Sequence, residues 1–478
     1  MDREKTLAGR LRAYADSGML PMHMPGHKRK VPREILEQMR DVYELDLTEV
    51  EGTDDLHHSR GILKEAMDHA AELWGAKKSF FLINGSSCGV LAAIHACLMR
   101  AKEGGGEKKY ALAAAQNVHF SARHAMELLG LEEISLPLGR FPDTGIFLPP
   151  SPKALEEILQ REKEKGKNII GVFITSPGYE GVGADIQALS RVCRMHQIPL
   201  IVDEAHGAHL LFFKKEGVKE NFPDTAIRRG GDLVIQSLHK TLPSPTQTAL
   251  LHLADKEWIP YGARALRIFE TSSPSYILMA GMDACIRYME GAGKEIQNYI
   301  QRLKAFQEKM KNLRYLKLWQ PPGEEISFDF CKLIVPAPDF SLKYKEFNGI
   351  IDGIALAGIL RRDYKIETEM ALTGYVLAMS TLCDGREDLD RLFFALKDLD
   401  DRLGRALSQG EGALRELVCQ REPSLAIQFL RGQRAREDIV LYPPGIVLAK
   451  KGEIVDGDIY RQLLELQKKG ANLYGILD

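Results

Sequence analysis

A lysine and an aspartate stand at the ends of two apolar segments that are typical of buried β-strands. Lys240 lies in Ser237-Leu-His-Lys-Thr-Leu242, directly after the apolar run 232–236, and Asp203 follows a second run, 199–202. Side chains at the exits of two such strands can meet on one side of a sheet. The pair could hold an electron-withdrawing cofactor, the lysine as an imine and the aspartate on a ring nitrogen.

The flanks of Lys240 distinguish it from an ordinary solvated lysine, which is the alternative interpretation. An apolar strand precedes it and Thr241-Leu-Pro243 follows. A lysine in such a place loses solvation and its pKa falls, which favours the neutral amine needed for a Schiff base. Asp203 could be only a helix cap or turn former. Facing a pyridinium nitrogen, it would keep the ring of pyridoxal phosphate electron-poor.

Phosphate donors are expected where a strand passes into a helix at Asn84-Gly-Ser86-Ser87. Backbone N–H groups and hydroxyls converge at such a helix N-terminus and bind phosphate without a lysine. The alternative is a plain helix cap, since serine is a preferred capping residue. Ser237 and His239, beside Lys240, could add further phosphate contacts.

Three histidines accompany these residues. His119 follows a weaker strand at 110–113 and could stack flat on a cofactor ring, although a lone histidine is more often structural. His206 and His209 are spaced as in metal sites, beside Asp203. The other interpretation is that at least one of them packs or hydrogen-bonds, and we favour this for His209.

Alternating strands and helices predict the architecture. Strands are expected at 80–83, 110–113, 168–174, 199–202, 232–236 and 248–252, and helices at 87–99, 122–129 and 186–196. This alternation predicts an α/β fold, a mostly parallel sheet with helices on both faces. Farther on, a helix at 292–313, strands at 326–330 and 332–335, and helices near 344–360 and 388–403 predict an α+β region. We therefore expect an N-terminal arm (1–65), a cofactor-binding large domain (66–300) and a smaller C-terminal α+β domain (301–478).

Composition narrows the class of protein. The 478 residues are 45% hydrophobic and 27% charged, with a net charge of -2 and no long basic tract, so nucleic acid and anionic membranes are not expected partners. No apolar run reaches the length of a membrane span, and no signal peptide is recognisable. Seven cysteines without a Cys-x-x-Cys pair fit reduced thiols in a cytoplasm.

These motifs together resemble the Orn/Lys/Arg decarboxylases of bacteria, in particular their shorter members without an N-terminal wing domain. The resemblance extends from Met24-Pro-Gly-His-Lys28 to Tyr442-Pro-Pro-Gly445. Its most specific pieces are Asp203-Glu-Ala-His-Gly-Ala-His209, Ser237-Leu-His-Lys-Thr-Leu242 and Thr271-Ser-Ser-Pro-Ser-Tyr276. It implies an aspartate-aminotransferase-like large domain, pyridoxal 5′-phosphate as cofactor, and a homodimer or higher homo-oligomer with the active site at the subunit interface.

The resemblance also implies roles for individual residues. Lys240 would bind the cofactor covalently, Asp203 would pair with its ring nitrogen, and His119 would stack on the ring. Phosphate contacts would come from Ser86, Ser87, Ser237, His239 and, from the other subunit of the dimer, Thr271. Ala205 and His206 would line the pocket. Glu369 matches an acidic position near the substrate's distal cation.

The implied reaction is decarboxylation of lysine, arginine or ornithine to cadaverine, agmatine or putrescine, with Asp203 stabilising the electron sink and Lys240 or His206 returning a proton. The chain departs from the family at Gln116 and Phe120, where an Arg and a Lys are usual, and at Pro245, where a Leu is usual. Transamination or elimination on the same cofactor, a metallohydrolase built on Asp203, His206 and His209, and a non-catalytic homologue stay open as alternatives.

Overall fold

The computed structural model describes residues 14–50, 52–105, 108–218, 221–323, 325–338, 351–417, 430–441, 446–468 and 473–475. The motif at 442–445 and the first part of the helix expected near 344–360 lie outside these ranges.

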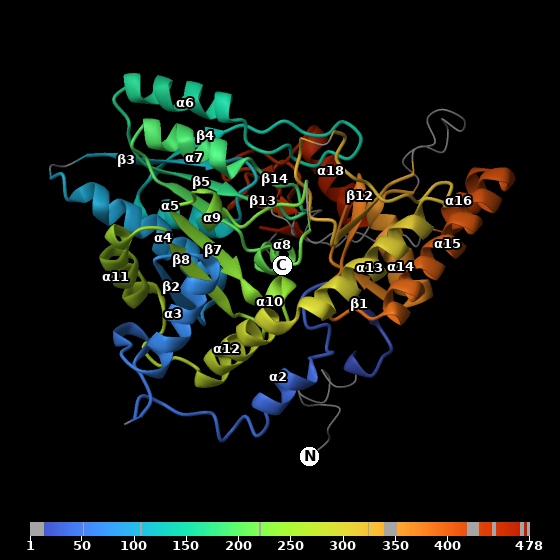
Figure 1. Cartoon of the computed structure of the whole chain (residues 1–478). Coiled ribbons are helices and arrows are strands. Elements are labelled where there is room, and N and C mark those ends of the chain that lie inside the picture. Colours follow the sequence, from blue (N-terminus) through green and yellow to red (C-terminus); the bar gives the residue numbers. More distant parts are fainter. Residues whose placement is uncertain are drawn as a thin grey trace, which may run out of the picture.

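A seven-stranded sheet forms the centre of the larger part of the molecule (Figure 1). β8 runs antiparallel to its two neighbours, while the other neighbouring pairs are parallel. The mostly parallel sheet and its six expected strands are therefore confirmed, with ends shifted by a few residues; the edge strand β4 was not predicted. In spatial order the strands are β2 (Lys78–Leu82), β8 (Ala249–Leu253), β7 (Leu233–Ser237), β6 (Leu200–Asp203), β5 (Asn168–Thr175), β3 (Tyr110–Ala115) and β4 (Glu132–Leu136).

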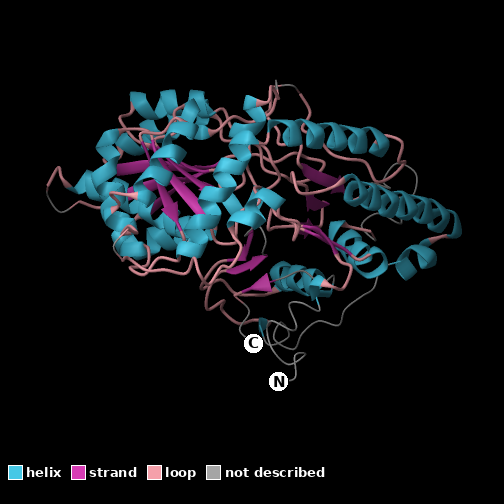
Figure 2. Cartoon of the chain, turned by 60° about the horizontal axis from the view of Figure 1, so that its bottom comes forward, coloured by secondary structure: helices cyan, strands magenta, loops and turns pink. Residues whose placement is uncertain are grey.

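Helices cover both faces of this sheet (Figure 2). Strands covered on both faces are apolar along their whole length rather than alternating. β3 shows this clearly, since all six of its residues are buried, and alanine-rich β3 consequently gives only a weak strand pattern. The helices of this part are α3 (Ile62–Trp74), α4 (Gly85–Lys102), α5 (Phe120–Leu129), α6 (Pro152–Glu164), α7 (Ile186–Met195), α8 (Leu210–Lys215), α9 (Ala226–Arg229), α10 (Leu238–Thr241), the 3₁₀ turn η3 (Lys256–Trp258) and α11 (Ile259–Phe269).

The C-terminal part begins after α12 (Tyr276–Gly291) and contains a three-stranded antiparallel sheet of order β11-β12-β9. The expected helices at 292–313 and 388–403 and the strand at 332–335 are confirmed, and the helix expected near 344–360 begins only at Gly353. The elements are α13 (Gly293–Met310), β9 (Lys332–Pro336), α14 (Gly353–Tyr364), β10 (Ile366–Thr368), β11 (Met370–Leu372), β12 (Tyr375–Met379), α15 (Arg386–Gln409) and α16 (Glu411–Leu417).

The strand expected at 326–330 is wrong. In this stretch Phe328 forms an isolated bridge with Val182. The next residue turns the chain, because the Asp329 carboxylate accepts from the N–H of Cys331 at 3.0 Å. The bonds from Asp329 N–H to Gly181 O and from Gly183 N–H to Ser327 O, both 2.8 Å, make this one bridge, and the pairing goes no further.

The N-terminal arm crosses beneath both parts (Figure 1). Its strand β1 (Leu20–Met22) pairs in parallel with β10, and α2 (Arg33–Gln38) and the 3₁₀ turn η2 (Leu56–His58) follow. In the loop between β1 and α2, the N–H of Gly26 donates to His239 O at 2.7 Å. A Cβ at Gly26 would lie only 2.7 Å from Leu242 O, so glycine is what lets the arm pack against α10.

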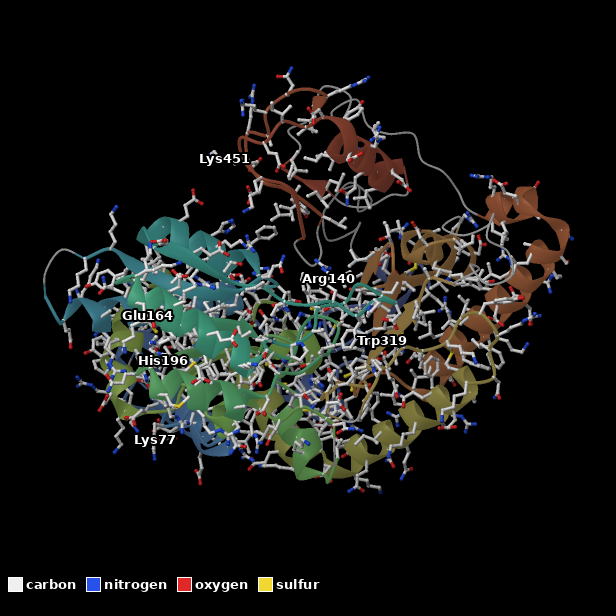
Figure 3. The ribbon with its side chains drawn as sticks, turned by 90° about the horizontal axis from the view of Figure 1, so that it is seen from above. Lys77, Arg140, Glu164, His196, Trp319 and Lys451 are labelled. Atoms are coloured by element: carbon white, nitrogen blue, oxygen red, sulfur yellow. The ribbon has the colours of Figure 1, made fainter. Side chains whose placement is uncertain are left out.

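The last described elements form a small lobe. They are β13 (Ile439–Leu441), β14 (Ile446–Ala449), α18 (Gly457–Lys468) and β15 (Leu473–Tyr474), with strand order β14-β13-β15. Figure 3 shows Lys451, in this lobe, projecting from the body of the molecule. Among the described helices of the whole chain, none has the length and apolar character of a membrane span.

Candidate active site

The strand register brings the candidate residues to one edge of the large sheet. Leu82 and Ser237 both pair with Ala249, and Asp203 pairs with Thr175 on one side and Ile235 on the other. The carboxyl ends of β2, β5, β6 and β7 therefore meet at this edge, where ligands bind in such sheets. The start of α4, Asp203 and Lys240 all lie along it.

Lys240 lies in α10, the single helical turn that follows β7. Its Nζ is 3.2 Å from Nε2 of His206 and 6.0 Å from the centre of the Tyr179 ring. Burial lowers the pKa of the Lys240 amine, and the negative charges of Asp203 and Glu369 partly oppose this. A lowered pKa increases the fraction of neutral, nucleophilic amine.

His206 is buried beside Lys240, with a relative exposure of 3%. The Tyr179 ring leans on it, with centroids 4.4 Å apart. Its Nδ1 contacts a second lysine, Lys332 of β9, at 3.2 Å. Burial first, and then the positive charges of Lys240 and Lys332, hold the pKa of His206 well below its usual value, so the imidazole is neutral at physiological pH.

Asp203 and His119 complete the side that would face a cofactor ring. Asp203 is buried, and its Oδ1 accepts from the N–H of Ala205 at 3.1 Å. Burial lowers the pKa of His119, while the nearby charge of Asp203 raises it and that of Lys240 lowers it. The His119 ring also caps α5, since its Nδ1 accepts from the N–H of Ser121 at 3.2 Å. This bond fixes the ring at its edge and leaves its face for stacking.

The loop into α4 has the properties of a phosphate site. Asn84 makes no side-chain cap, and Gly85 turns the chain at φ +80°. Ser86 is half-buried and Ser87 exposed at the uncapped end of this helix, where N–H groups attract anions.

Ser237 is the second observation that favours an anion here. Its Oγ is fully buried and has no hydrogen-bond partner within the described part of the chain. A buried unpaired hydroxyl is costly unless a ligand satisfies it. His239, two residues on, is held by Thr248 O at 3.0 Å from its Nδ1. The residues at this edge therefore fit pyridoxal phosphate, with Ser237 and the start of α4 on the phosphate and Asp203 on the ring.

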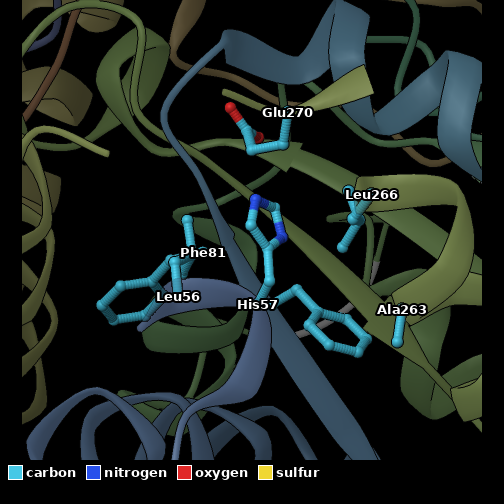
Figure 4. Close-up of a pocket in the computed structure, with 7 residues that line it drawn as sticks. Leu56, His57, Phe81, Ala263, Leu266 and Glu270 are labelled. Carbon is cyan, nitrogen blue, oxygen red and sulfur yellow. The ribbon is translucent and has the colours of Figure 1, made fainter. Parts of the chain in front are cut away.

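Thr271 follows Glu270, which lines a small pocket together with His57 (Figure 4). His57 of this pocket points toward Glu270, and its Nε2 contacts Thr271 O at 2.9 Å. Glu270 accepts from the N–H of Asn84 at 2.8 Å, which fixes the loop from behind. Burial raises the pKa of the Glu270 carboxyl above its usual value.

Glu369 reaches the same site from between β10 and β11. One carboxylate oxygen accepts from the Tyr179 hydroxyl, and the other accepts from the N–H of Met24 at 2.8 Å. Its charge acts on both Lys240 and Lys332, raising the pKa of each. The arm, the loop after β5 and the C-terminal part thus converge on one carboxylate.

His209 lies apart from the candidate active site. Its Nε2 is 3.2 Å from Oδ2 of Asp329, whereas His206 faces Lys240 and Lys332. The two histidines spaced like metal ligands consequently use different partners, and the arrangement gives no support to the metallohydrolase alternative.

Two residues of the site were not predicted. Tyr179 follows β5, the most convincing strand of the sequence, so its position at a strand exit was a usable signal. Lys332 opens the apolar strand Lys332-Leu-Ile-Val335, and a lysine that begins a buried strand was a second signal. What placed Lys332 in the site is the pairing of the segment before β9 with the loop after β5, which no local pattern reveals.

Comparison with known proteins gives a consistent result. The family model for the Orn/Lys/Arg decarboxylase major domain matches residues 6–341. The chain is 28% identical to the uncharacterized protein YaaO of Bacillus subtilis, covering 95% of this chain and 92% of that protein. It is 27% identical to the arginine decarboxylase of the same organism, covering 93% and 90%. The constitutive lysine decarboxylase of E. coli shares the fold at a TM-score of 0.68 and 15% identity, covering 99% of this chain and 76% of that chain.

Proposed function

Because the chain belongs to the Orn/Lys/Arg decarboxylase family, we propose that it converts a basic amino acid to the corresponding amine and CO₂ with pyridoxal 5′-phosphate as cofactor. The chain is a decarboxylase; the cofactor and the choice among lysine, arginine and ornithine are the proposed part. The observation that carries the proposal is the Lys240 amine, 3.2 Å from His206 Nε2 and beside Asp203 at the sheet edge.

Each residue of the site has a defined task in this proposal. Pyridoxal phosphate supplies an electron sink when bound. Ser86, Ser87, Ser237, His239 and Thr271 are proposed to hold its phosphate. Asp203 would keep its ring nitrogen protonated, His119 would stack on its face, and Ala205 with His206 would line the pocket. Lys240, with its lowered pKa, would supply the neutral amine that attaches covalently.

Loss of CO₂ leaves the substrate Cα in need of a proton. Nζ of Lys240 and Nε2 of His206 lie 3.2 Å apart, so a proton taken up by either group can be passed to the other before it is delivered to Cα. In balance, one amino acid and one proton give one amine and one CO₂. Burial of His206 keeps water away from this step.

Glu369 is the proposed partner of the substrate's distal cation. A carboxylate has about four lone-pair positions, and Glu369 uses its two oxygens to accept from Tyr179 and Met24. Acceptor capacity therefore remains for an ammonium or guanidinium. A cation of this kind would be costly to bury without a charged partner, which favours basic substrates over neutral ones.

A homodimer or higher homo-oligomer and a cytoplasmic location are further parts of the proposal. Residues 36–50 of the arm expose apolar side chains that a monomer would leave in water: Leu36, Val42, Tyr43, Leu47 and Val50. Apolar side chains gathered in one segment favour contact with another protein surface.

The test is an assay of the purified chain with pyridoxal phosphate and lysine, arginine or ornithine, with amines, oxo acids and CO₂ measured separately. An amine and CO₂ in equal amounts from at least one substrate is the expected result. An oxo acid without CO₂ would identify transamination instead. No product from any of the three would refute the proposed reaction.

Glu369→Gln tests the substrate part of the proposal. We expect KM for the preferred basic amino acid to rise by about tenfold or more, because one desolvated charge pair is lost. An unchanged KM would remove Glu369 from the proposed substrate site while leaving the reaction itself untouched.

A further inference from the structure

His206 is contacted by a lysine amine at each of its ring nitrogens. Lys240 Nζ lies 3.2 Å from Nε2, and Lys332 Nζ lies 3.2 Å from Nδ1. A neutral imidazole has one N–H donor and one bare acceptor nitrogen. One lysine must therefore donate to the bare nitrogen, and the other amine must accept from the N–H, which only an uncharged amine can do.

The imidazole itself is the neutral member of this group. Burial and the surrounding positive charges lower the pKa of His206 far below its usual value. The titratable groups that act on this group of three from the neighbouring elements are Asp203 on β6, His119 before α5, His239 on α10, Asp329 before β9, Cys331 before β9, Glu369 between β10 and β11, and Tyr179 after β5.

Lys332 is the lysine better placed to keep its charge. Burial lowers the pKa of Lys332 as well, and Asp329, three residues away, is the largest influence that opposes it; burial would raise the pKa of Asp329, but His209 and Lys332 beside it lower it. Lys240 depends mainly on Asp203. In the proposed function Asp203 is occupied by the ring nitrogen of the cofactor.

The Lys332 side chain is also confined to one path. Gly181 turns at φ +92°, and a Cβ there would lie 2.7 Å from Cγ of Lys332. The loop that contains Gly181 is tied to the same turn, since Asp329 N–H donates to Gly181 O at 2.8 Å. With a relative exposure of 2%, Lys332 cannot turn to water, and its amine remains at Nδ1 of His206.

We propose that Lys332 is a positioning residue that donates to Nδ1 of His206 and thereby holds the N–H of the ring on Nε2, directed at the uncharged amine of Lys240. Its purpose rests on the proposed function: the same bond keeps Lys240 nucleophilic, leaves the N–H of the ring on the nitrogen that faces Lys240, and lets the Lys332 ammonium replace that proton through Nδ1 when it leaves. A lysine of the C-terminal part thus sets the protonation of a pair on the large sheet.

The first test measures the pKa of the Lys240 amine in the full-length chain without added cofactor, by competitive acetylation across pH with mass-spectrometric readout of the Lys240 peptide. Lys332→Met removes a nearby positive charge and frees Nε2 to accept from a Lys240 ammonium. Both effects act in the same direction, so the labelling midpoint should rise by about one pH unit. An unchanged or lower midpoint in a folded variant would overturn the proposal.

Two variants serve as controls for this measurement. Lys28→Met removes another lysine that is 1% exposed and whose amine donates to the backbone oxygens of His23 and Met379, not to His206. It should leave the Lys240 midpoint in place. Lys332→Arg retains a charged donor at this position and should keep the midpoint nearer to the wild-type value than Lys332→Met does.

The second test uses the wild-type chain, so it tests the proposal even if Lys332→Met does not fold. Nitrogen-15 NMR of histidine-labelled wild-type chain, with the His206 signals identified by their loss in His206→Gln, reports which ring nitrogen carries the proton. A protonated Nε2 and bare Nδ1 are expected, and the reverse would overturn the proposal. Neither test uses turnover, so a chain inactive on all three amino acids would refute the proposed function and leave this result separate.

Discussion

Asp203 and Glu204 are consecutive buried carboxylates with opposite surroundings. Glu204 accepts from the Thr225 hydroxyl at 2.8 Å, from the N–H of Ala226 at 2.7 Å, and from the side-chain amide of Gln236. Asp203 accepts from the N–H of Ala205 at 3.1 Å and otherwise faces His119 and Lys240, whose pKa values it raises. One carboxylate closes the packing between β6, β7 and α9, and the other is turned to the sheet edge.

The contrast shows that burial and charge alone do not identify a residue that contacts a ligand. Burial raises the pKa of Glu204 to about 8, yet its hydrogen bonds are made within the protein. Ser237, like Asp203, is buried at the sheet edge. Its Oγ has no hydrogen-bond partner among the described residues. Bonding capacity left unused at a sheet edge is the better signal of a ligand site.

The largest expected effect is the loss of decarboxylation when the lysine at the sheet edge is replaced. Lys240→Ala should lower decarboxylation by at least about 10³-fold, because it removes the amine that would attach the cofactor. Product formation and borohydride-stable cofactor on the protein are measured together, with Lys28→Met as a control for a buried lysine outside the site. Substantial activity in folded Lys240→Ala would contradict the role given to Lys240.

The next effect compares the two carboxylates directly. Asp203→Asn should lower kcat on the order of 10²-fold, because the charge that favours a protonated ring nitrogen is lost. Glu204→Gln is the matched change one residue away and should leave kcat near the wild-type value. The comparison fails if Glu204→Gln harms kcat as much as Asp203→Asn while both variants remain folded.

The two carboxylates should rank the other way for stability, where replacing Glu204 costs more than replacing Asp203. Glu204→Ala leaves the Thr225 hydroxyl and the N–H of Ala226 without their acceptor and Gln236 with only its 3.2 Å bond to Thr225, and each buried unpaired group costs about 1–3 kcal/mol. We expect the free energy of unfolding to fall by about 3 kcal/mol in Glu204→Ala and by less in Asp203→Ala. Urea unfolding followed by circular dichroism measures both. Equal losses would remove the distinction between the two carboxylates.

The smallest effect, taken per pH unit, is a change of stability with pH. The pKa of Glu204 is raised from 4.5 to about 8 in the folded chain, so the folded state holds this proton more tightly than the unfolded state does. Its contribution to stability is complete below about pH 4.5 and is lost as the pH rises through about 8. Relative to Glu204→Gln, the wild type should lose up to about 1.4 kcal/mol per pH unit across this window. Parallel curves for the two proteins would exclude it.

Most strands of the large sheet could be predicted from the amino-acid sequence. Continuous apolar runs such as 168–174 predict strands covered on both faces, and the polar residues just after them predict an active edge. The failures came where contacts between distant segments decide the structure. The run 326–330 alternates like a strand, but the Asp329 turn limits it to a single bridge between Phe328 and Val182. The edge strand β4 (Glu132–Leu136) escaped because exposed glutamates interrupt its pattern.

Local chemistry in the amino-acid order established that Lys240, Asp203, His119 and the serines at the start of α4 stand at strand exits, and a parallel sheet brings such exits together. That order does not reveal which of two neighbouring carboxylates is already bonded, or that Lys332 reaches His206 from 126 residues away. These are matters of contact between β9, the loop after β5 and the arm. A side chain's protonation depends on every charge and dipole within a few ångströms, and only packing brings those together.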